Sequence, residues 1–179
     1  RPETDAGQPR ARTLSLGAGP WRPTLVPELA LPREVERQLF HWFEPAAHPE
    51  WYDAAHSPIS LIEYAEDRYF ATFPDVGHGV KAGIHHEGAV IDPDAPREGA
   101  TQEEGREMGE LLARYLPDAA GRILDRATCV YTNTPDHDFL IDRPPAHARV
   151  IITTPCPGPG LTCPPPSAPL PAGRGPPRA

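Results

Sequence analysis

Residues 101–117, TQEEGREMGELLARYLP, carry the clearest helix pattern in this chain and decide its fold class. Thr101 followed three residues later by Glu104 is a capping box, and a glutamate at that position also suits the positive end of the helix dipole. Apolar residues then repeat at helical spacing: Met108, Leu111, Leu112 and Tyr115. Pro117 ends the run, so one helix of about three to four turns is predicted.

Short strand patterns lie on both sides of this helix. Before it, strands are expected at 13–19 (running into a glycine turn), at 34–43, twice within 59–73 around a turn at 65–67, and at 79–86. After it, they are expected at 127–132, 138–142 and 149–154. PELALP at 27–32 predicts a short helix or turn. The order of strands, helix, strands is typical of a mixed α+β arrangement.

The two ends of the chain differ from its middle. Residues 1–11 are polar and predict a disordered lead-in, and the chain begins with Arg1 rather than Met, which leads us to expect a fragment. The Pro-rich residues 155–179 have no periodicity, so we expect a disordered or polyproline II tail.

Composition excludes several classes of protein. The net charge of -8 over 179 residues argues against a phosphate-backbone binder. No run approaches the roughly 18 apolar residues of a spanning helix, so no membrane contact is expected. Three cysteines are not a disulfide framework, and a cytoplasmic protein is the default expectation.

The densest polar cluster is VKAGIHHEGAVIDPD at 80–94. On a strand, Lys81 and His85 point to one face and His86 to the other. Three interpretations remain open: a solvated strand end leading into an Asp-Pro-Asp turn, a strand that presents Lys81 and His85 to a site, or a metal site. Adjacent strand histidines are expected to diverge, which disfavours metal, and no metal ligand set is predicted.

Cys129, in the strand candidate TCVYT, is either a small buried apolar residue or a reactive thiolate helped by a nearby cation, with Arg126 close in sequence. Cys156 and Cys163 show no zinc spacing and are interpreted as incidental. Alternation over 34–43 places Val35 and His41 on one side and Phe40 and Trp42 on the other. The chain contains no GxGxxG, P-loop or GxSxG pattern, so the residues by themselves predict no reaction.

Four segments, in order, resemble the monomeric sarcosine oxidase and N-methyltryptophan oxidase family of FAD-dependent amine oxidases. They are LSLGAGPW (14–21), VERQLFHWFEP (35–45), GVKAGIHHEGAVIDPDAPRE (79–98) and ATCVYTNTPDHDFLIDRPPAH (127–147). The resemblance implies the D-amino-acid oxidase-like fold, in its C-terminal part: a substrate domain with a mixed sheet plus part of the FAD-binding domain. The N-terminal Rossmann unit of that family is missing here.

The same resemblance implies domain bounds. Residues 12–31 would be a partial FAD-binding segment and 32–125 the substrate-binding domain. Residues 126–154 would return to the FAD domain. It also implies a monomer that acts on a small-molecule amine and O2, with no nucleic-acid or membrane partner.

Site residues carry over by position in the matched segments. Cys129 would link covalently to the flavin, and Gly17, Ala18 and Trp21 would contact this cofactor. Lys81 would activate oxygen, because a fixed cation in a dry site stabilises the negative charge formed there. His85 would lie near the substrate, and Tyr131 close to flavin and substrate. Phe40, Trp42 and Tyr64 would line the substrate pocket, unless they are ordinary core aromatics.

Departures from the family pattern are as informative. The family's Ser-Gly-His-Gly-Phe-Lys-Phe segment is replaced by residues 157–163, which suggests a frameshift near Cys156, testable on the nucleotide sequence. Ala71 stands where a tyrosine is expected. The arginine that holds the substrate carboxylate falls in the missing part. We therefore expect weak or no flavin binding and no turnover for this chain.

The expected reaction of the lineage is FAD-dependent oxidation of the C–N bond of a secondary amine or N-methyl amino acid, with O2 reduced to hydrogen peroxide. The alternative is a non-catalytic remnant or binding module of a broken oxidase gene. A third interpretation, a metal hydrolase using His85, His86 and Asp92, would predict bound zinc.

Overall fold

The computed structural model describes residues 5, 7, 11–21, 25, 27, 34–95, 99–138 and 140–154. PELALP after Pro27, most of the lead-in, and the tail with Cys156 and Cys163 lie outside the described residues. The chain divides into two compact units, one of residues 35–131 and one that combines 1–34 with 132–179. Each unit is described by itself. No helix in the described ranges is long and apolar enough to cross a membrane.

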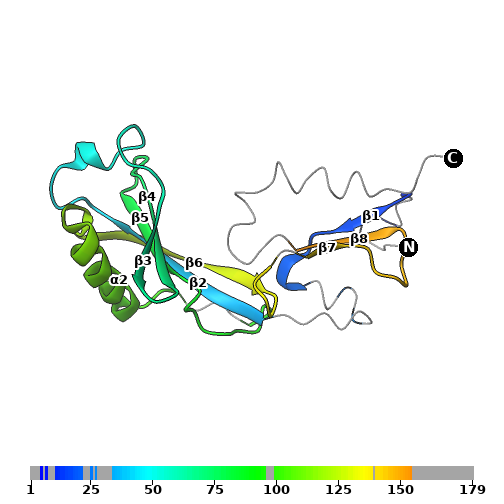
Figure 1. Cartoon of the computed structure of the whole chain (residues 1–179). Helices are drawn as coiled ribbons and strands as arrows, with labels where there is room; N and C mark the ends of the chain where they lie inside the picture. The colour runs from blue at the N-terminus through cyan, green and yellow to red at the C-terminus, as the bar shows by residue number, and fades with distance from the viewer. Residues whose placement is uncertain are drawn as a thin grey trace. The chain divides into compact units, whose positions relative to one another are not determined.

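The unit of residues 35–131 is a five-stranded sheet with one helix against it (Figure 1). Its strands lie in the order β3-β4-β5-β2-β6. Their bounds are β2 Glu34–Phe43, β3 Ser60–Ala65, β4 Arg68–Phe73, β5 Val80–His85 and β6 Ile123–Asn133. The pairs β3–β4, β4–β5 and β5–β2 are antiparallel. The predicted strands at 34–43, 59–73 and 79–86 are confirmed, and the one predicted at 127–132 begins earlier, at Ile123.

Helix α2, Gln102–Tyr115, forms where the capping box predicts it. The Thr101 hydroxyl accepts from the Glu104 amide at 3.2 Å, and the Glu104 carboxylate accepts from the Thr101 amide at 2.7 Å. Leu116 caps the other end through its amide, and a short 3-10 helix, η4 (Pro117–Ala119), follows. A further 3-10 helix, η3 (Pro49–Trp51), lies between β2 and β3.

The core of this unit lies between α2 and one face of the sheet. Its buried members come from strands β2, β4 and β5, from α2, and from the two 3-10 segments: Phe43, Tyr52, Phe70, Val80, Ala82, Met108, Leu112 and Ala119. Gly79 lies directly before β5 with a φ of 93°, and a Cβ there would come within 2.6 Å of the Phe43 carbonyl oxygen. Glycine is needed at this turn because both the positive φ and the close approach exclude a side chain.

The other unit contains a three-stranded sheet in the order β1-β8-β7. Strand β1 (Leu14–Leu16) pairs parallel with β8 (Val150–Thr154), which pairs antiparallel with β7 (Leu140–Asp142). The mixed pairing therefore lies in this sheet. The resemblance implied a mixed sheet in the substrate domain, where the pairs β3–β4, β4–β5 and β5–β2 are antiparallel. After β1 the chain turns through the 3-10 helix η1 (Gly19–Trp21).

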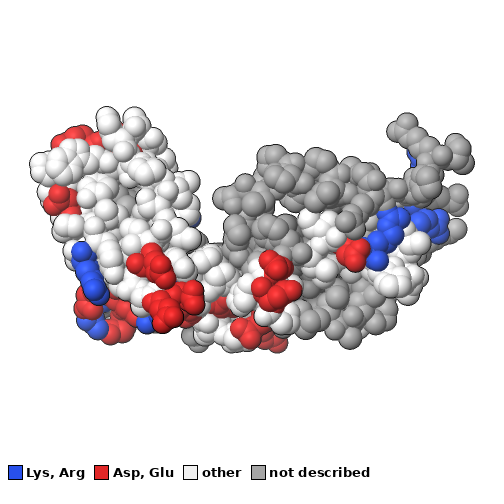
Figure 2. All heavy atoms as spheres, viewed as in Figure 1, with Lys and Arg blue, Asp and Glu red and all other residues white. Residues whose placement is uncertain are grey.

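Charges of both signs mix on the surface of the 35–131 unit. On α2, Arg106 pairs with Glu103 and Glu110. In the face that Figure 2 presents, Lys and Arg side chains lie among Asp and Glu side chains near the helix. This mixture is typical of a solvated helix face.

Candidate active site

Four of the predicted site residues lie on one face of the five-stranded sheet. On β5, Lys81 and His85 are four residues apart and therefore share a face. Phe70 and Ala82 belong to the core, so the alternate residues of β4 and β5 point away from α2. The Tyr131 hydroxyl contacts the His85 ring, and Cys129, two residues before Tyr131 on β6, has the same direction. Lys81, His85, Cys129 and Tyr131 thus form what we call the open face of the sheet.

Lys81 is a half-buried cation on this open face. Burial lowers the pKa of its ammonium group, and the nearby Cys129 thiol, when ionised, raises the pKa. Within the described residues no ion pair joins Lys81 to a carboxylate. No carboxylate of the described residues therefore neutralises its positive charge.

His85 and Tyr131 are joined directly. The His85 Nδ1 atom and the Tyr131 hydroxyl oxygen lie 3.0 Å apart, and the two rings meet edge to face with centroids 5.4 Å apart. The hydrogen bond fixes the orientation of a side chain on β5 relative to one on β6, across β2. The contact therefore holds the imidazole in one orientation on the open face.

The expectation that His85 and His86 diverge is wrong. Strand β5 ends at His85, and His86 has a left-handed backbone with a φ of 58°. That conformation turns the His86 ring back, so its centroid lies 4.1 Å from that of His85 and 5.0 Å from that of Tyr131. His86 Nδ1 also lies 3.4 Å from a carboxylate oxygen of the buried Glu36.

A metal-ligand cluster is nevertheless not formed by the described side chains, which contain no group of three or more candidate ligands. Asp92 accepts hydrogen bonds from the amides of Asp94 and Ala95 and so stabilises the predicted Asp-Pro-Asp turn. That part of the sequence interpretation is confirmed.

Cys129 is half-buried and forms no disulfide within the described residues. The cation expected beside it, Arg126, is the wrong one. Arg126 donates to the Ala100 carbonyl at 3.3 Å, and its charge lowers the pKa of His41, whose ring lies under α2. Lys81 supplies the positive charge near Cys129 instead. Sequence distance misled here because alternate residues of a strand face opposite ways.

Gly17, Ala18 and Trp21 belong to the other compact unit. The Ala18 carbonyl accepts from the Trp21 amide at 3.1 Å, which closes the turn after β1. The Trp21 side chain is 39% exposed. These three residues form one local turn in that unit, whereas the open face belongs to the unit of residues 35–131.

The aromatic residues considered for a pocket divide between the two faces. The Tyr64 ring packs against Phe70 on the core side, where burial and a hydrogen bond to Glu87 raise its pKa to about 12. Phe40 and Trp42 lie on the open face next to Lys81. Phe73, which the sequence interpretation did not single out, joins them. Phe73 on β4 is paired with Lys81 on β5, so strand alternation predicts their contact once the register of these two strands is known.

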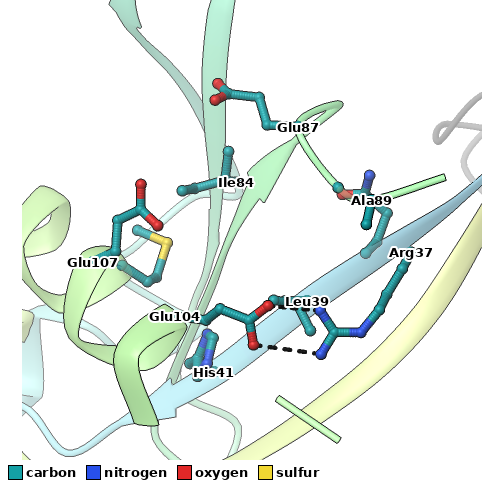
Figure 3. Close-up of a pocket in the computed structure, with 11 residues that line it drawn as sticks. Arg37, Leu39, His41, Ile84, Glu87, Ala89, Glu104 and Glu107 are labelled. Atoms are coloured by element: carbon teal, nitrogen blue, oxygen red, sulfur yellow. Dashed lines mark hydrogen bonds and ion pairs between the residues drawn. The ribbon is translucent and has the colours of Figure 1, made fainter. Parts of the chain in front are cut away.

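The opposite face of the sheet has a small cavity of about 160 Å³ under α2 (Figure 3). Arg37 and Glu104 face one another at its edge, with the Arg37 Nη1 atom 2.7 Å from Glu104 Oε1. This pairing lowers the pKa of Glu104 to about 2. His41 is buried beside them, and desolvation lowers its pKa. None of the predicted site residues lines this cavity.

The sequence matches the family model described as FAD dependent oxidoreductase over residues 3–170. Two curated relatives are monomeric sarcosine oxidases. The one from Streptomyces avermitilis is 34% identical over 76% of this chain and 36% of its own length. The one from Bacillus sp. is 34% identical over 84% of this chain and 40% of its own length. N-methyl-L-tryptophan oxidase from Citrobacter koseri is 32% identical over 89% of this chain and 42% of its own length.

Solved structures show the same fold. The fructosamine oxidase Amadoriase II from Aspergillus fumigatus superposes with a TM-score of 0.66 at 21% identity, over 96% of this chain and 42% of that one. Amadoriase I from the same organism gives a TM-score of 0.64 at 21% identity, over 85% of this chain and 37% of that one. The chain thus spans about two fifths of the length of the proteins it matches.

Proposed function

The chain belongs to the FAD-dependent oxidoreductase family, and from this premise we propose that its 35–131 unit supplies the flavin-facing sheet of an amine oxidase. The substrate class is a secondary amine or N-methyl amino acid, in keeping with relatives named sarcosine oxidase and N-methyl-L-tryptophan oxidase. In the overall reaction the C–N bond is oxidised to an imine, O2 is reduced to hydrogen peroxide, and water hydrolyses the imine to aldehyde and amine.

The observation that carries this proposal is the gathering of Lys81, His85, Cys129 and Tyr131 on the face that α2 leaves open. The set fits a flavin chemically. It offers a thiol that can form a thioether, a cation without a carboxylate partner in the described residues, and aromatic surface for a planar ring. A solvated strand end would not require a half-buried lysine beside a half-buried thiol.

Each side chain then has a distinct task. Bound FAD would supply the electron acceptor for the substrate and the electron donor for O2. Lys81 would stabilise negative charge on the oxygen molecule as it is reduced, because a fixed cation acts strongly where water is excluded. Cys129 would anchor the cofactor. His85, held by Tyr131, would orient the substrate on the same face.

The domain assignment follows the same proposal. Residues 35–131 would form the substrate-side domain, and β1, β7 and β8 would belong to the FAD-binding part. Gly17, Ala18 and Trp21 would contact the cofactor there. Because 35–131 is one compact unit, the substrate domain would include Cys129 and Tyr131 rather than end at residue 125.

Flavin attachment tests the proposal directly. We would express the full chain with added FAD, denature it, and look for flavin fluorescence in the protein band of a gel. The proposal predicts fluorescence that Cys129→Ser abolishes and that the matched control Cys163→Ser retains, whereas the departures from the family pattern predict a band with little or no flavin. A band without flavin in the wild-type chain would contradict attachment through Cys129 and favour the non-catalytic alternative.

Peroxide release completes the test. The chain is assayed with sarcosine and with N-methyl-L-tryptophan, and Lys81→Met serves as the comparison. Turnover that Lys81→Met lowers by two orders of magnitude or more, with flavin retained, would support the oxygen-activating role. Turnover unaffected by Lys81→Met would overturn that role. The earlier expectation of no turnover by the chain alone stays a prediction that the same assay decides.

A further inference from the structure

Three aromatic rings surround the ammonium group of Lys81. The Nζ atom lies 4.0 Å from the centroid of the Phe40 ring, 4.8 Å from that of Phe73 and 5.4 Å from that of Trp42. Each distance is within the roughly 6 Å at which a cation is attracted to an aromatic face. Three cation–π interactions therefore act on this one ammonium group.

We infer that Phe40, Trp42 and Phe73 are positioning residues that hold the Lys81 ammonium in place, charged, on the open face. The inference rests on the proposed function, because it assigns these rings a role in the oxygen chemistry of Lys81. We call the three rings the aromatic enclosure.

The pairing of the strands builds this enclosure. Lys81 on β5 is paired with Trp42 on β2 at one side and with Phe73 on β4 at the other. Directly opposed residues on one face bring their side chains into contact. Phe40, two residues before Trp42 on β2, closes a third side. Its ring meets that of Phe73 edge to face, with centroids 6.2 Å apart.

Gly83 makes room for the Phe40 ring. A Cβ at Gly83 would lie 2.7 Å from Phe40 Cδ1 and 2.4 Å from the Leu39 carbonyl oxygen. Any side chain there would displace the ring that is nearest to Lys81. A glycine is therefore needed at position 83, because the Phe40 ring of β2 lies directly over β5 at this point.

The aromatic enclosure can stabilise the charged form of Lys81 without neutralising its charge, which a salt bridge would not do. Burial disfavours the charged form of Lys81, so some interaction must favour that form if the ammonium is to act. A carboxylate partner would do so but would also neutralise the field of the cation. The negative faces of aromatic rings attract the ammonium and leave its net charge intact.

Other titratable groups share the open face with Lys81. Cys129 and Tyr131 on β6 and His85 on β5 can change charge there, and an ionised Cys129 raises the Lys81 pKa. His86 and Glu36, whose side chains lie 3.4 Å apart, adjoin His85 and Tyr131 at the end of this face. In the described part of the chain, the ion pairs of Arg68 with Glu87 and of Arg37 with Glu104 form elsewhere in this unit. Because several groups on this face can change charge, the pKa of Lys81 must be measured from a signal of its own side chain.

Lys81 is the only lysine in the sequence, which makes that measurement simple. Flavin-free full chain labelled with ¹³C,¹⁵N-lysine gives one side-chain Cε–Hε resonance, and its shift is followed from pH 6 to 11. In the wild-type chain we expect Hε shifted upfield by the ring currents. We expect Phe40→Leu, Phe73→Leu or Trp42→Leu each to lower the Lys81 pKa by about 0.5 to 1, because leucine keeps the burial but removes the attraction.

Matched variants separate attraction from packing. Phe40→Tyr and Phe73→Tyr keep a ring and should keep the upfield Hε shift of the wild-type chain below about pH 9, where the added phenol is neutral. Phe70→Leu removes a ring from the core face and should leave the Lys81 resonance and pKa unchanged. Circular dichroism checks that each variant is folded. An Hε shift like that of a free lysine, or leucine variants with an unchanged or raised pKa, would overturn the inference.

The flavin plays no part in this titration. A failed titration would leave the amine oxidase proposal standing, whereas failed flavin attachment would leave the aromatic enclosure standing.

Discussion

The two faces of the five-stranded sheet are made from alternating residues of the same strands, yet they differ in almost every property. The face under α2 contains Phe70 and Ala82, which belong to one core with Leu112 of the helix, and each of the three is 0% exposed. The open face contains Lys81, Cys129 and other half-buried groups. One face is closed and apolar, and the other is polar, aromatic and accessible.

This difference separates stability from chemistry within one sheet. Full burial of apolar side chains against the helix provides the free energy that holds the strands together. The open face can then carry groups that folding alone would not favour, such as a half-buried cation in contact with rings. In the amine oxidase that we propose, this face would contact the cofactor and the substrate.

The largest expected effect is a stability difference between equivalent substitutions on the two faces. Phe70→Ala should lower the free energy of unfolding by about 3 to 5 kcal/mol, because it leaves a cavity in a closed core. Phe40→Ala, on the open face, should cost about 1 to 2 kcal/mol, because its ring is only half-buried. Urea denaturation followed by circular dichroism measures both. Equal losses would contradict the assignment of the core to one face.

A smaller effect on stability concerns the ion pair between Arg37 of β2 and Glu104 of α2. The Arg37 guanidinium lowers the pKa of Glu104 from 4.5 to about 2. The native state therefore binds this proton less readily than the unfolded state, so the stabilisation is complete above about pH 4.5 and is lost as the pH falls toward 2. Glu104→Gln should cost about 1 to 2 kcal/mol at pH 7, since the pair is partly exposed, and less with falling pH.

Urea denaturation between pH 2.5 and 7 gives this profile. Thr101→Ala is the comparison: it removes the hydroxyl that caps the helix, at a cost of about 1 kcal/mol, and with it the hydrogen bond from that hydroxyl to Glu104 Oε2. It keeps the Arg37 ion pair, so it should reduce the pH dependence only in part. A Glu104→Gln deficit that stayed constant across this range would show that Arg37 does not stabilise the carboxylate.

The smallest effect concerns the hydrogen bond on the open face. Tyr131→Phe removes the hydroxyl next to His85 Nδ1 and should cost about 0.5 to 1 kcal/mol. Tyr115→Phe removes a hydroxyl that donates to the Tyr64 carbonyl on the core face and should cost a similar amount. The ¹⁵N shifts of the His85 ring distinguish them. We expect a change only in Tyr131→Phe, and equal spectra would show that the contact does not orient the imidazole.

Local signals in the sequence were sufficient for the elements. The Thr101–Glu104 capping box and Pro117 bounded the helix because capping and helix termination involve neighbouring residues only. Alternation over 34–43 separated Phe40 and Trp42 from Val35 and His41 for the same reason. The family resemblance supplied Lys81, His85, Cys129 and Tyr131 as one set, and the structure brings these four to one face.

Relations between strands could not be obtained in this way. The cation near Cys129 is Lys81 rather than Arg126, because the pairing of distant strands, and not sequence distance, decides which charges meet. His86 turns back toward His85 because the strand ends in a left-handed residue, which the alternation pattern does not reveal. The contact of Phe73 with Lys81 depends on the register of β4 against β5.

The sequence by itself therefore determined the type and order of the elements, the family, and the residues available for chemistry. Only the tertiary structure decided which side chains share the open face, which lie under α2, and which rings surround Lys81. The reason is physical: local backbone preferences and caps act over a few residues, whereas the surroundings of a charge depend on the register of strands that are far apart in the chain.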